Sequence, residues 1–134
     1  MLLNKLNILV DESTNVTVIV SPDPESSDTR IDLTTTDLTT LYTVPSANVA
    51  VVKSILVSND AGSSCNITIT LVDASSNIFS LFKTKAVDTN TTTELLTQPL
   101  VMEESEILKV QASDANELHV IASILQIQPR EVTS

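Results

Sequence analysis

Apolar and polar residues alternate strictly over seven positions in the middle of the chain, residues 65–71. The apolar set starts at Cys65 and takes every second residue to Leu71, and the residues between are Asn or Thr. Because successive side chains of a strand point to opposite faces, this period predicts a strand with one buried and one wet face. The same period recurs at residues 15–21 and 108–112.

The remaining pattern also favours strands over helices. Val, Ile and Thr are frequent, and their branched side chains fit a pleated sheet better than a helix. Clusters of turn-forming residues separate the segments at residues 59–64, 73–77, 88–93 and 113–116. The sequence allows one helical turn, at residues 93–100 or 103–108. We therefore expect an all-β fold, an antiparallel β-sandwich of jelly-roll or immunoglobulin-like type.

Two segments, residues 49–57 and 118–127, are apolar at both odd and even positions. A strand that is apolar on both faces lies between two layers, or its outer face is covered by a partner. A chain of 134 residues has few layers to spare. The pattern therefore predicts self-association into a homo-oligomer.

The first thirty residues differ from the rest. One strand pattern, residues 15–21, is flanked by polar residues 11–14 and 21–28, where Pro22 and Pro24 favour extended chain over a regular strand. The segment is either a long surface loop or an arm that reaches a neighbouring subunit. We expect an N-terminal strand and polar arm at 1–30, a β-sandwich domain at 31–127 and a C-terminal tail at 128–134.

Charge excludes several classes of partner. The chain carries 7 Lys and Arg against 17 Asp and Glu, a formal net charge of −10. Binding to nucleic acid or to an anionic membrane surface requires cationic side chains, so neither partner is expected. The N-terminal residues lack the apolar core of a signal peptide, which predicts folding in a cytoplasm. A single cysteine forms no intramolecular disulfide, and no Cys/His grouping is spaced to bind zinc.

The residues that could serve in catalysis or metal binding all have ordinary structural explanations. His119 falls within an apolar strand and has no second ligand or nucleophile nearby in the sequence, so it is expected to be a plain strand residue. Cys65 shares the parity of the buried face and is expected in the core. Glu103, Glu104 and Glu106 suit a solvated turn better than a calcium site, since no DxDxDG-type loop is present.

The second acidic set, Asp23, Glu25 and Asp28, is expected to be solvated for the same reason. Aromatic residues make up only 2% of the chain, which argues against a glycosidase cleft and a sugar-stacking module. No GxSxG elbow or SxxK pair occurs. We predict no catalytic, cofactor-binding or metal-binding residue, and no enzyme activity.

The order of the segments from Leu41 to Ile127 resembles a known family. It runs through the motifs Tyr42-Thr43-Val44-Pro45, Val51-Val52-Lys53-Ser54-Ile55, Val57-Ser58-Asn59, Pro99-Leu100-Val101-Met102-Glu103 and Leu108-Lys109-Val110-Gln111-Ala112-Ser113. About two-thirds of the chain is similar in this way to the small β-sandwich virion structural proteins of tailed bacteriophages, including marine and cyanobacterial phages. Such proteins commonly have a glycine-containing turn before the last of these motifs, where this chain has Glu104-Ser105-Glu106.

The resemblance implies a building block of the virion that is made in the host cytoplasm. The leading hypothesis is a capsid decoration or cement protein, a trimer at threefold positions, that stabilises the head by contacts with itself and the major capsid protein. A component of the neck, tail or fibres is the alternative within this class. A receptor- or glycan-binding tip module that uses the polar loops 59–64 or 73–77 is the alternative from another class.

Overall fold

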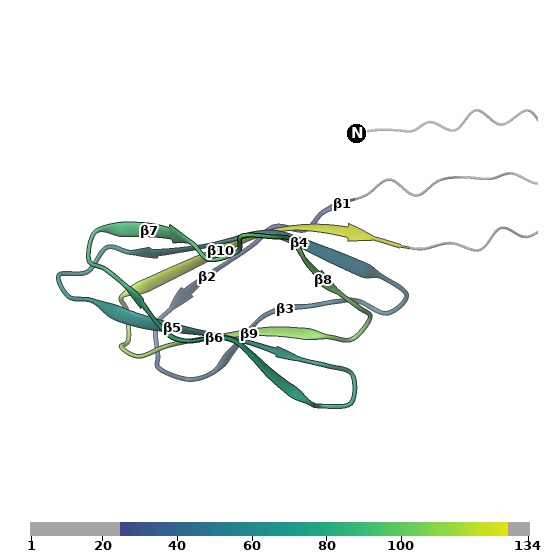
Figure 1. The fold of residues 1–134 in the computed structure, drawn as a ribbon, viewed down its shortest axis with the longest axis horizontal. Helices are drawn as coiled ribbons and strands as arrows, with labels where there is room; N and C mark the ends of the chain where they lie inside the picture. Colours follow the sequence, from purple (N-terminus) through teal and green to yellow (C-terminus); the bar gives the residue numbers. More distant parts are fainter. Residues whose placement is uncertain (1–24, 129–134) are drawn as a thin grey trace, which may run out of the picture.

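The computed structural model describes residues 25–128, which form a sandwich of two antiparallel sheets (Figure 1). Sheet A holds β1 (Glu25–Ser26), β2 (Thr29–Leu33), β4 (Val49–Asn59), β7 (Thr91–Glu94), β8 (Leu100–Met102) and β10 (Leu118–Ile127). Sheet B has the strand order β3 (Thr39–Thr43), β9 (Ile107–Ala112), β5 (Cys65–Val72) and β6 (Ile78–Val87). None of the described residues forms a helix long and apolar enough to cross a membrane.

The core lies between the sheets, and the alternating strands supply it as the sequence predicts. On β5 and β9, the side chains of Cys65, Ile67 and Ile69 and of Leu108, Val110 and Ala112 are at most 1% exposed. Sheet A contributes the matching set from β4 and β10, including Ile55 and Val120. Tyr42 of β3 reaches across the gap, where its hydroxyl donates a 2.7 Å hydrogen bond to Gln126 Oε1 of β10.

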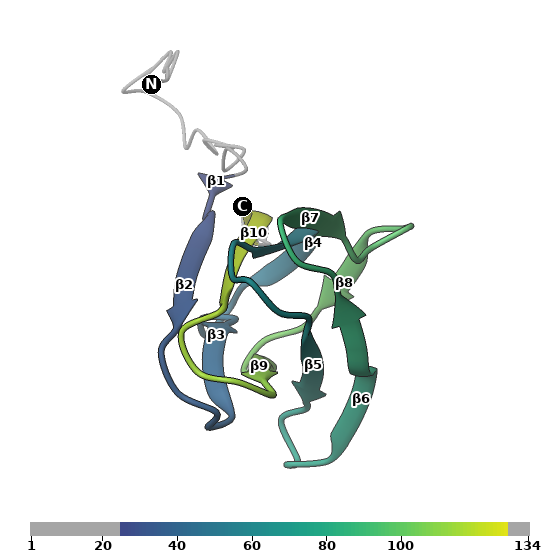
Figure 2. The ribbon, with the colours of Figure 1, turned by 90° about the vertical axis from the view of Figure 1, so that its left-hand side faces the viewer.

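β4 and β10 form the centre of sheet A. They pair over ten positions, from Leu118 opposite Asn59 to Ile127 opposite Val49, with one register shift between Ser123 and Ile124. Two short strands flank each of them: β1 and β2 pair with β10, while β7 and β8 pair with β4. In Figure 2, β10 lies between β2 and β4, in agreement with the pairing of these strands.

The prediction of a helical turn at residues 93–100 or 103–108 is wrong at both places. Residues 91–94 form β7, which pairs with β4, and residues 107–108 begin β9. Between them, residues 103–106 form a turn in which the backbone N–H of Glu106 donates to the carbonyl of Glu103. The ladders of neighbouring strands satisfy the backbone groups here, so a helical turn has no advantage.

The boundary expected between arm and sandwich also differs. Residues 25–30 were expected outside the sandwich, but β1 and the first residues of β2 belong to sheet A. Glu25 pairs with Gln126 and Ser26 with Leu125, directly after Pro24. The expected strand at 15–21, Asp23 and residues 129–134 of the tail lie outside the described residues.

Several tight turns use the left-handed backbone region without glycine. Ala47 has φ 61°, Ser105 φ 70° and Asn116 φ 63°, whereas Gly62 does not have a positive φ. Ser105 lies in the Glu104–Glu106 turn, so this turn reaches the left-handed region with a serine. Asn tolerates this region well, but for Ala the contact of Cβ with the following carbonyl costs roughly 1–2 kcal/mol.

Replacing Ala47 by glycine should therefore stabilise the protein. Because glycine carries no Cβ, we expect Ala47→Gly to raise the free energy of unfolding by up to about 1 kcal/mol after its entropic cost. Thermal unfolding of the full chain checks this. Asn116→Gly is the matched control and should change the stability less, since Asn already tolerates this conformation. A lower melting temperature for Ala47→Gly would contradict the assignment of strain to this turn.

Candidate functional site: the outer face of sheet A

The outer face of sheet A carries apolar side chains in rows that cross the strands. Val101 of β8, Val51 of β4 and Leu125 of β10 stand opposite one another in one row, and Ile127 lies beside Val49 in the next. Leu56 and Ile121 form a further row towards the middle of the sheet. Val101 is 59% exposed and Ile121 37%. We call this set the A-face patch: Val49, Val51, Leu56, Val101, Ile121, Leu125 and Ile127.

The local sequence explains why apolar residues point outwards here. Even positions of the first half of β4, such as Ala50 and Val52, are buried, and so are odd positions of its second half, such as Ile55. The switch of parity occurs at the irregularity around Lys53 and Ser54, opposite Ser123. Both parities are apolar, so the inward set fills the core while the outward set forms the patch. The prediction that both strands are apolar on two faces is confirmed.

On each flank of the β4–β10 pair, the two short strands are separated by a break next to this irregularity. A carboxylate lies at each break and accepts hydrogen bonds there. On the β10 side, between β1 and β2, Asp28 Oδ1 accepts a 3.2 Å hydrogen bond from the Ile124 N–H. On the β4 side, between β7 and β8, Glu94 Oε2 accepts hydrogen bonds from the N–H groups of Ile55 at 2.8 Å and Leu96 at 3.1 Å. The hydroxyl of Ser54 donates to the other oxygen of Glu94. Each acid therefore satisfies backbone donors that the ladder leaves free.

These contacts shift the titration of Glu94. Partial burial raises its pKa, but the hydrogen bonds from Ser54, Ile55, Leu96 and Leu95 outweigh burial, so the pKa is lower than that of an ordinary glutamate. No pattern in the sequence indicates this role, because residues 88–93 read as a turn and Glu94 falls in the helical turn that the sequence allowed at 93–100. Asp28, which was expected to be solvated, is exposed but bonded to the backbone of β10.

His119 lies on the outer face of β10, at the end of sheet A away from Leu125. Its Nδ1 is 3.2 Å from Asp32 Oδ1 of β2, and its Nε2 is 3.3 Å from Asp60 Oδ1 in the loop after β4. Only the protonated ring can donate to both carboxylates. Within residues 25–128, no hydroxyl or thiol hydrogen-bonds to His119, so the arrangement lacks the nucleophile that a catalytic triad requires.

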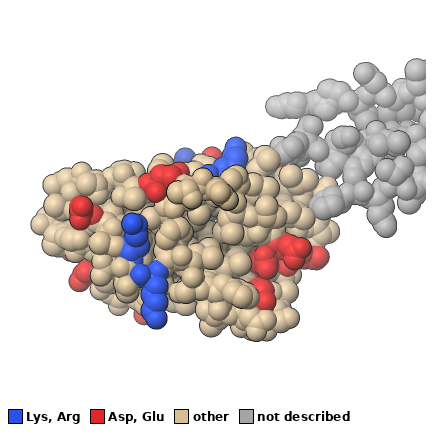
Figure 3. All heavy atoms as spheres, in the orientation of Figure 1, with Lys and Arg blue, Asp and Glu red and all other residues tan. Residues whose placement is uncertain are grey.

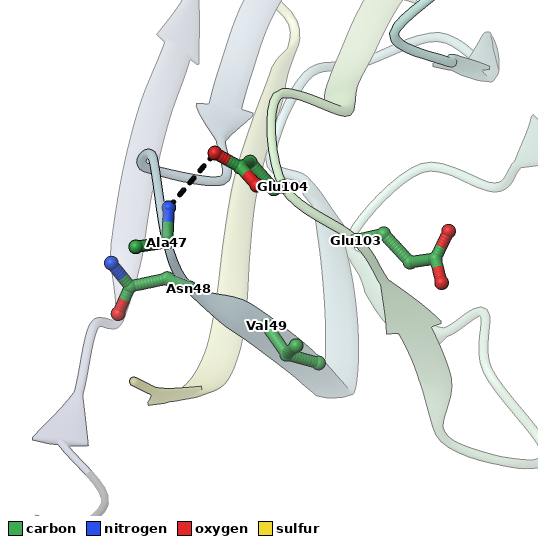
Figure 4. A pocket seen from close by; sticks show the side chains of 5 residues that line it. All are labelled: Ala47, Asn48, Val49, Glu103 and Glu104. Carbon is green, nitrogen blue, oxygen red and sulfur yellow. Dashed lines mark hydrogen bonds between the residues drawn. The ribbon is translucent and has the colours of Figure 1, made fainter. Parts of the chain in front are cut away.

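The acidic turn at Glu103 and Glu104 borders an open hollow of about 480 Å³ beside the start of β4 (Figure 4). Glu104 Oε2 accepts a 3.0 Å hydrogen bond from the Ala47 N–H, while the Glu103 side chain points away from this contact. Glu103 and Glu104 are exposed, as expected for a solvated turn, whereas Glu106 is half-buried and its Oε1 accepts a 2.8 Å hydrogen bond from the Glu103 N–H. The hollow adjoins the A-face patch at Val49 and has no aromatic lining.

One grouping at the opposite end of the sandwich includes a thiol. Cys65, Asp114 and Glu117 place one ligand atom each within 4.8 Å of one another. Cys65 is 1% exposed, as expected for a core residue, and Asp114 is exposed. Hydrogen bonds hold the group together, from Ser63 Oγ to Glu117 Oε1 and from Ser113 Oγ to Asp114 Oδ2. Glu117 Oε2 is buried without a hydrogen-bond partner among the described residues.

Charge is sparse on the side of the molecule that Figure 3 shows, where uncharged surface separates small acidic and basic groups.

No family model matches the chain, and no curated protein matches it. Solved structures do match. The likeness is one of fold. A chain of the Bacillus endospore appendages, which form a novel family of disulfide-linked pili, aligns with a TM-score of 0.52 and 13% identity, covering 87% of this chain and 100% of that chain.

Proteins of infectious bursal disease virus align more loosely. A chain of the T13 viral particle has a TM-score of 0.45 and 14% identity, and a chain of the Gt strain 0.40 and 13%. The chain spans 34% and 37% of those two proteins. The expected fold, an all-β antiparallel sandwich, is confirmed. The resemblance to phage virion proteins stays a prediction.

The Glu94 contacts predict a pH-dependent stability difference. Its folded-state pKa lies below the unfolded value, so its contribution is complete above the unfolded pKa and is lost as the pH falls through the folded pKa. Glu94→Gln should therefore be less stable than the wild type at pH 7, and the gap should close in acid. Urea unfolding at pH 7 and at several values below 4.5 measures this.

The matched control is Glu25→Gln, since Glu25 is an exposed residue on a flanking strand of the same sheet. The stability difference between Glu25→Gln and the wild type should not decrease as the pH falls. A stability difference for Glu94→Gln that is the same at every pH would show that the carboxylate charge plays no part.

Proposed function

We propose that the protein is a non-enzymatic structural subunit of a tailed-bacteriophage virion, a capsid decoration or cement protein that stabilises the head by subunit–subunit contacts. The observation that carries the proposal is the A-face patch. Contiguous apolar surface on a soluble protein marks a site of interaction. Here the apolar rows lie on the two central strands of sheet A, β4 and β10, on both sides of the Ser54–Ser123 pair.

The edge strand β6 exposes Ile78 and Phe79 at its start, but its second half is poorly suited to pairing with another strand. The edge strand β6 carries Lys83 and Lys85, and its pairing with β5 shifts register twice. Between the lysines, Thr84 has φ 48° and donates its N–H to the side chain of Thr68. Charges and bulges of this kind block the addition of another strand. Edge-to-edge pairing through the second half of β6 is therefore disfavoured.

The charge of the chain fits a protein that is present in many copies near packaged DNA. A formal net charge of −10 keeps copies soluble and repels the phosphate backbone. Charges of both signs border the patch: Arg30 stands opposite Ile121 and Lys53 is exposed beside Ser54, while Glu94 stands opposite Leu56. The phage setting itself rests on the resemblance of residues 41–127.

Charged substitutions in the patch test the proposal. Val101→Lys and Ile121→Lys place an ammonium group at the proposed contact and should weaken self-association of the full chain by roughly tenfold to a hundredfold. Light scattering after size-exclusion chromatography measures the association. Thr40→Lys adds the same charge to an exposed position of β3 in sheet B and should leave association unchanged.

Two results would overturn the proposal. The first is a wild-type chain that stays monomeric up to about 100 µM, a concentration at which even a weak specific complex with micromolar affinity forms, because the patch would then have no role. The second is equal association of the Val101→Lys and Thr40→Lys variants, since the contact would then not depend on the patch.

A further inference from the structure

We infer that the A-face patch of one subunit is covered by the N-terminal segment, residues 1–20, of a neighbouring copy. This inference rests on the proposed function, because it names the occupant of the same contact surface. Two features of the described residues carry it: the place where the chain enters sheet A, and the composition of the patch. The length and sequence of the preceding residues supply the rest.

The chain enters sheet A at the end of a strand. β1 runs antiparallel to β10 and pairs Glu25 with Gln126, next to the last residue of that strand. The chain therefore comes to β1 from beyond the end of the sheet. A return of residues 16–20 onto the patch of the same subunit requires a reversal within residues 21–24, where Pro22 and Pro24 favour extended chain. We therefore place residues 16–20 on the patch of another subunit.

The preceding segment is long enough to reach one. Residues 1–24 span up to about 80 Å when fully extended. Eleven of the first 20 residues are apolar, in two stretches at 1–10 and 16–20. Surface of that character needs burial. The A-face patch is an apolar surface of the same chain that needs a cover, and one contact between copies buries both.

The size of the patch also matches. From Ile127 to Ile121 the patch extends six positions along β10, roughly 20 Å, and an extended stretch of residues 16–20 covers roughly 16 Å of it. Val16, Val18 and Val20 share one face of such a stretch.

Mixing two full-length variants tests this contact. One protein carries Val16→Cys, Val18→Cys or Val20→Cys, and the other carries Val101→Cys on the patch. The native Cys65 is 1% exposed and stays out of the reaction. Docking raises the effective concentration of the thiols, so mild oxidation should give at least about tenfold more cross-linked heterodimer than a Val101→Cys mixture with Thr17→Cys, or than a mixture of Val18→Cys with Thr40→Cys.

Two results would overturn the inference. The first is cross-linking no higher than in the two control mixtures. The second is a Val18→Cys, Val101→Cys double variant that closes a disulfide within one chain at high dilution, which would place the segment on its own subunit.

The oligomeric state, recorded on the same samples by light scattering, separates this inference from the proposed function. Association that Val101→Lys weakens, without cross-linking above the controls, keeps the patch as a contact and removes the N-terminal segment as its occupant. A monomeric wild type without cross-linking removes both.

Discussion

The pairing of β4 with β10 is the constraint on which the other elements of sheet A depend. Ten residue pairs join the two strands, and their inward side chains meet those of β5 and β9 in the core. The irregularity at Ser123 and Ile124 divides the pair, so each flank carries two short strands instead of one long one. Asp28 and Glu94 accept the backbone donors at the two gaps and allow the sheet to continue past them.

This arrangement also determines where the molecule can meet others. A strand pair that is apolar on both faces fills the core with one side and leaves the other uncovered. Polar groups limit the uncovered area at one end, where His119 stands between Asp32 and Asp60. At the other end the apolar rows continue to Ile127, close to the point where β1 brings in the N-terminal part of the chain. The contact surface and the entry of the chain into β1 therefore lie at the same end of the sandwich.

Periodicity predicted the strands well where side chains decide the structure, as at Cys65–Val72, because burial of one face leaves a two-residue repeat in the sequence. It failed at Thr91–Glu94 and Glu25–Ser26, where backbone pairing with an existing strand decides and side chains add little. The partners of Glu94 and His119 come from distant parts of the chain, so no local pattern could reveal them. The outward apolar set on β4 and β10 was visible in the sequence, but its layout as rows required the register.

We propose that the protein is a repeated structural subunit of a phage head. Its copy number in purified particles of the proposed phage, measured by quantitative mass spectrometry against the major capsid protein, tests this proposal most directly. The account predicts a number in a fixed ratio to the capsid protein and on the order of hundreds of copies, as closed symmetric shells require. A few copies to a few tens would place the protein in the neck, tail or fibres and contradict the decoration role. Absence from the particle would contradict the account as a whole.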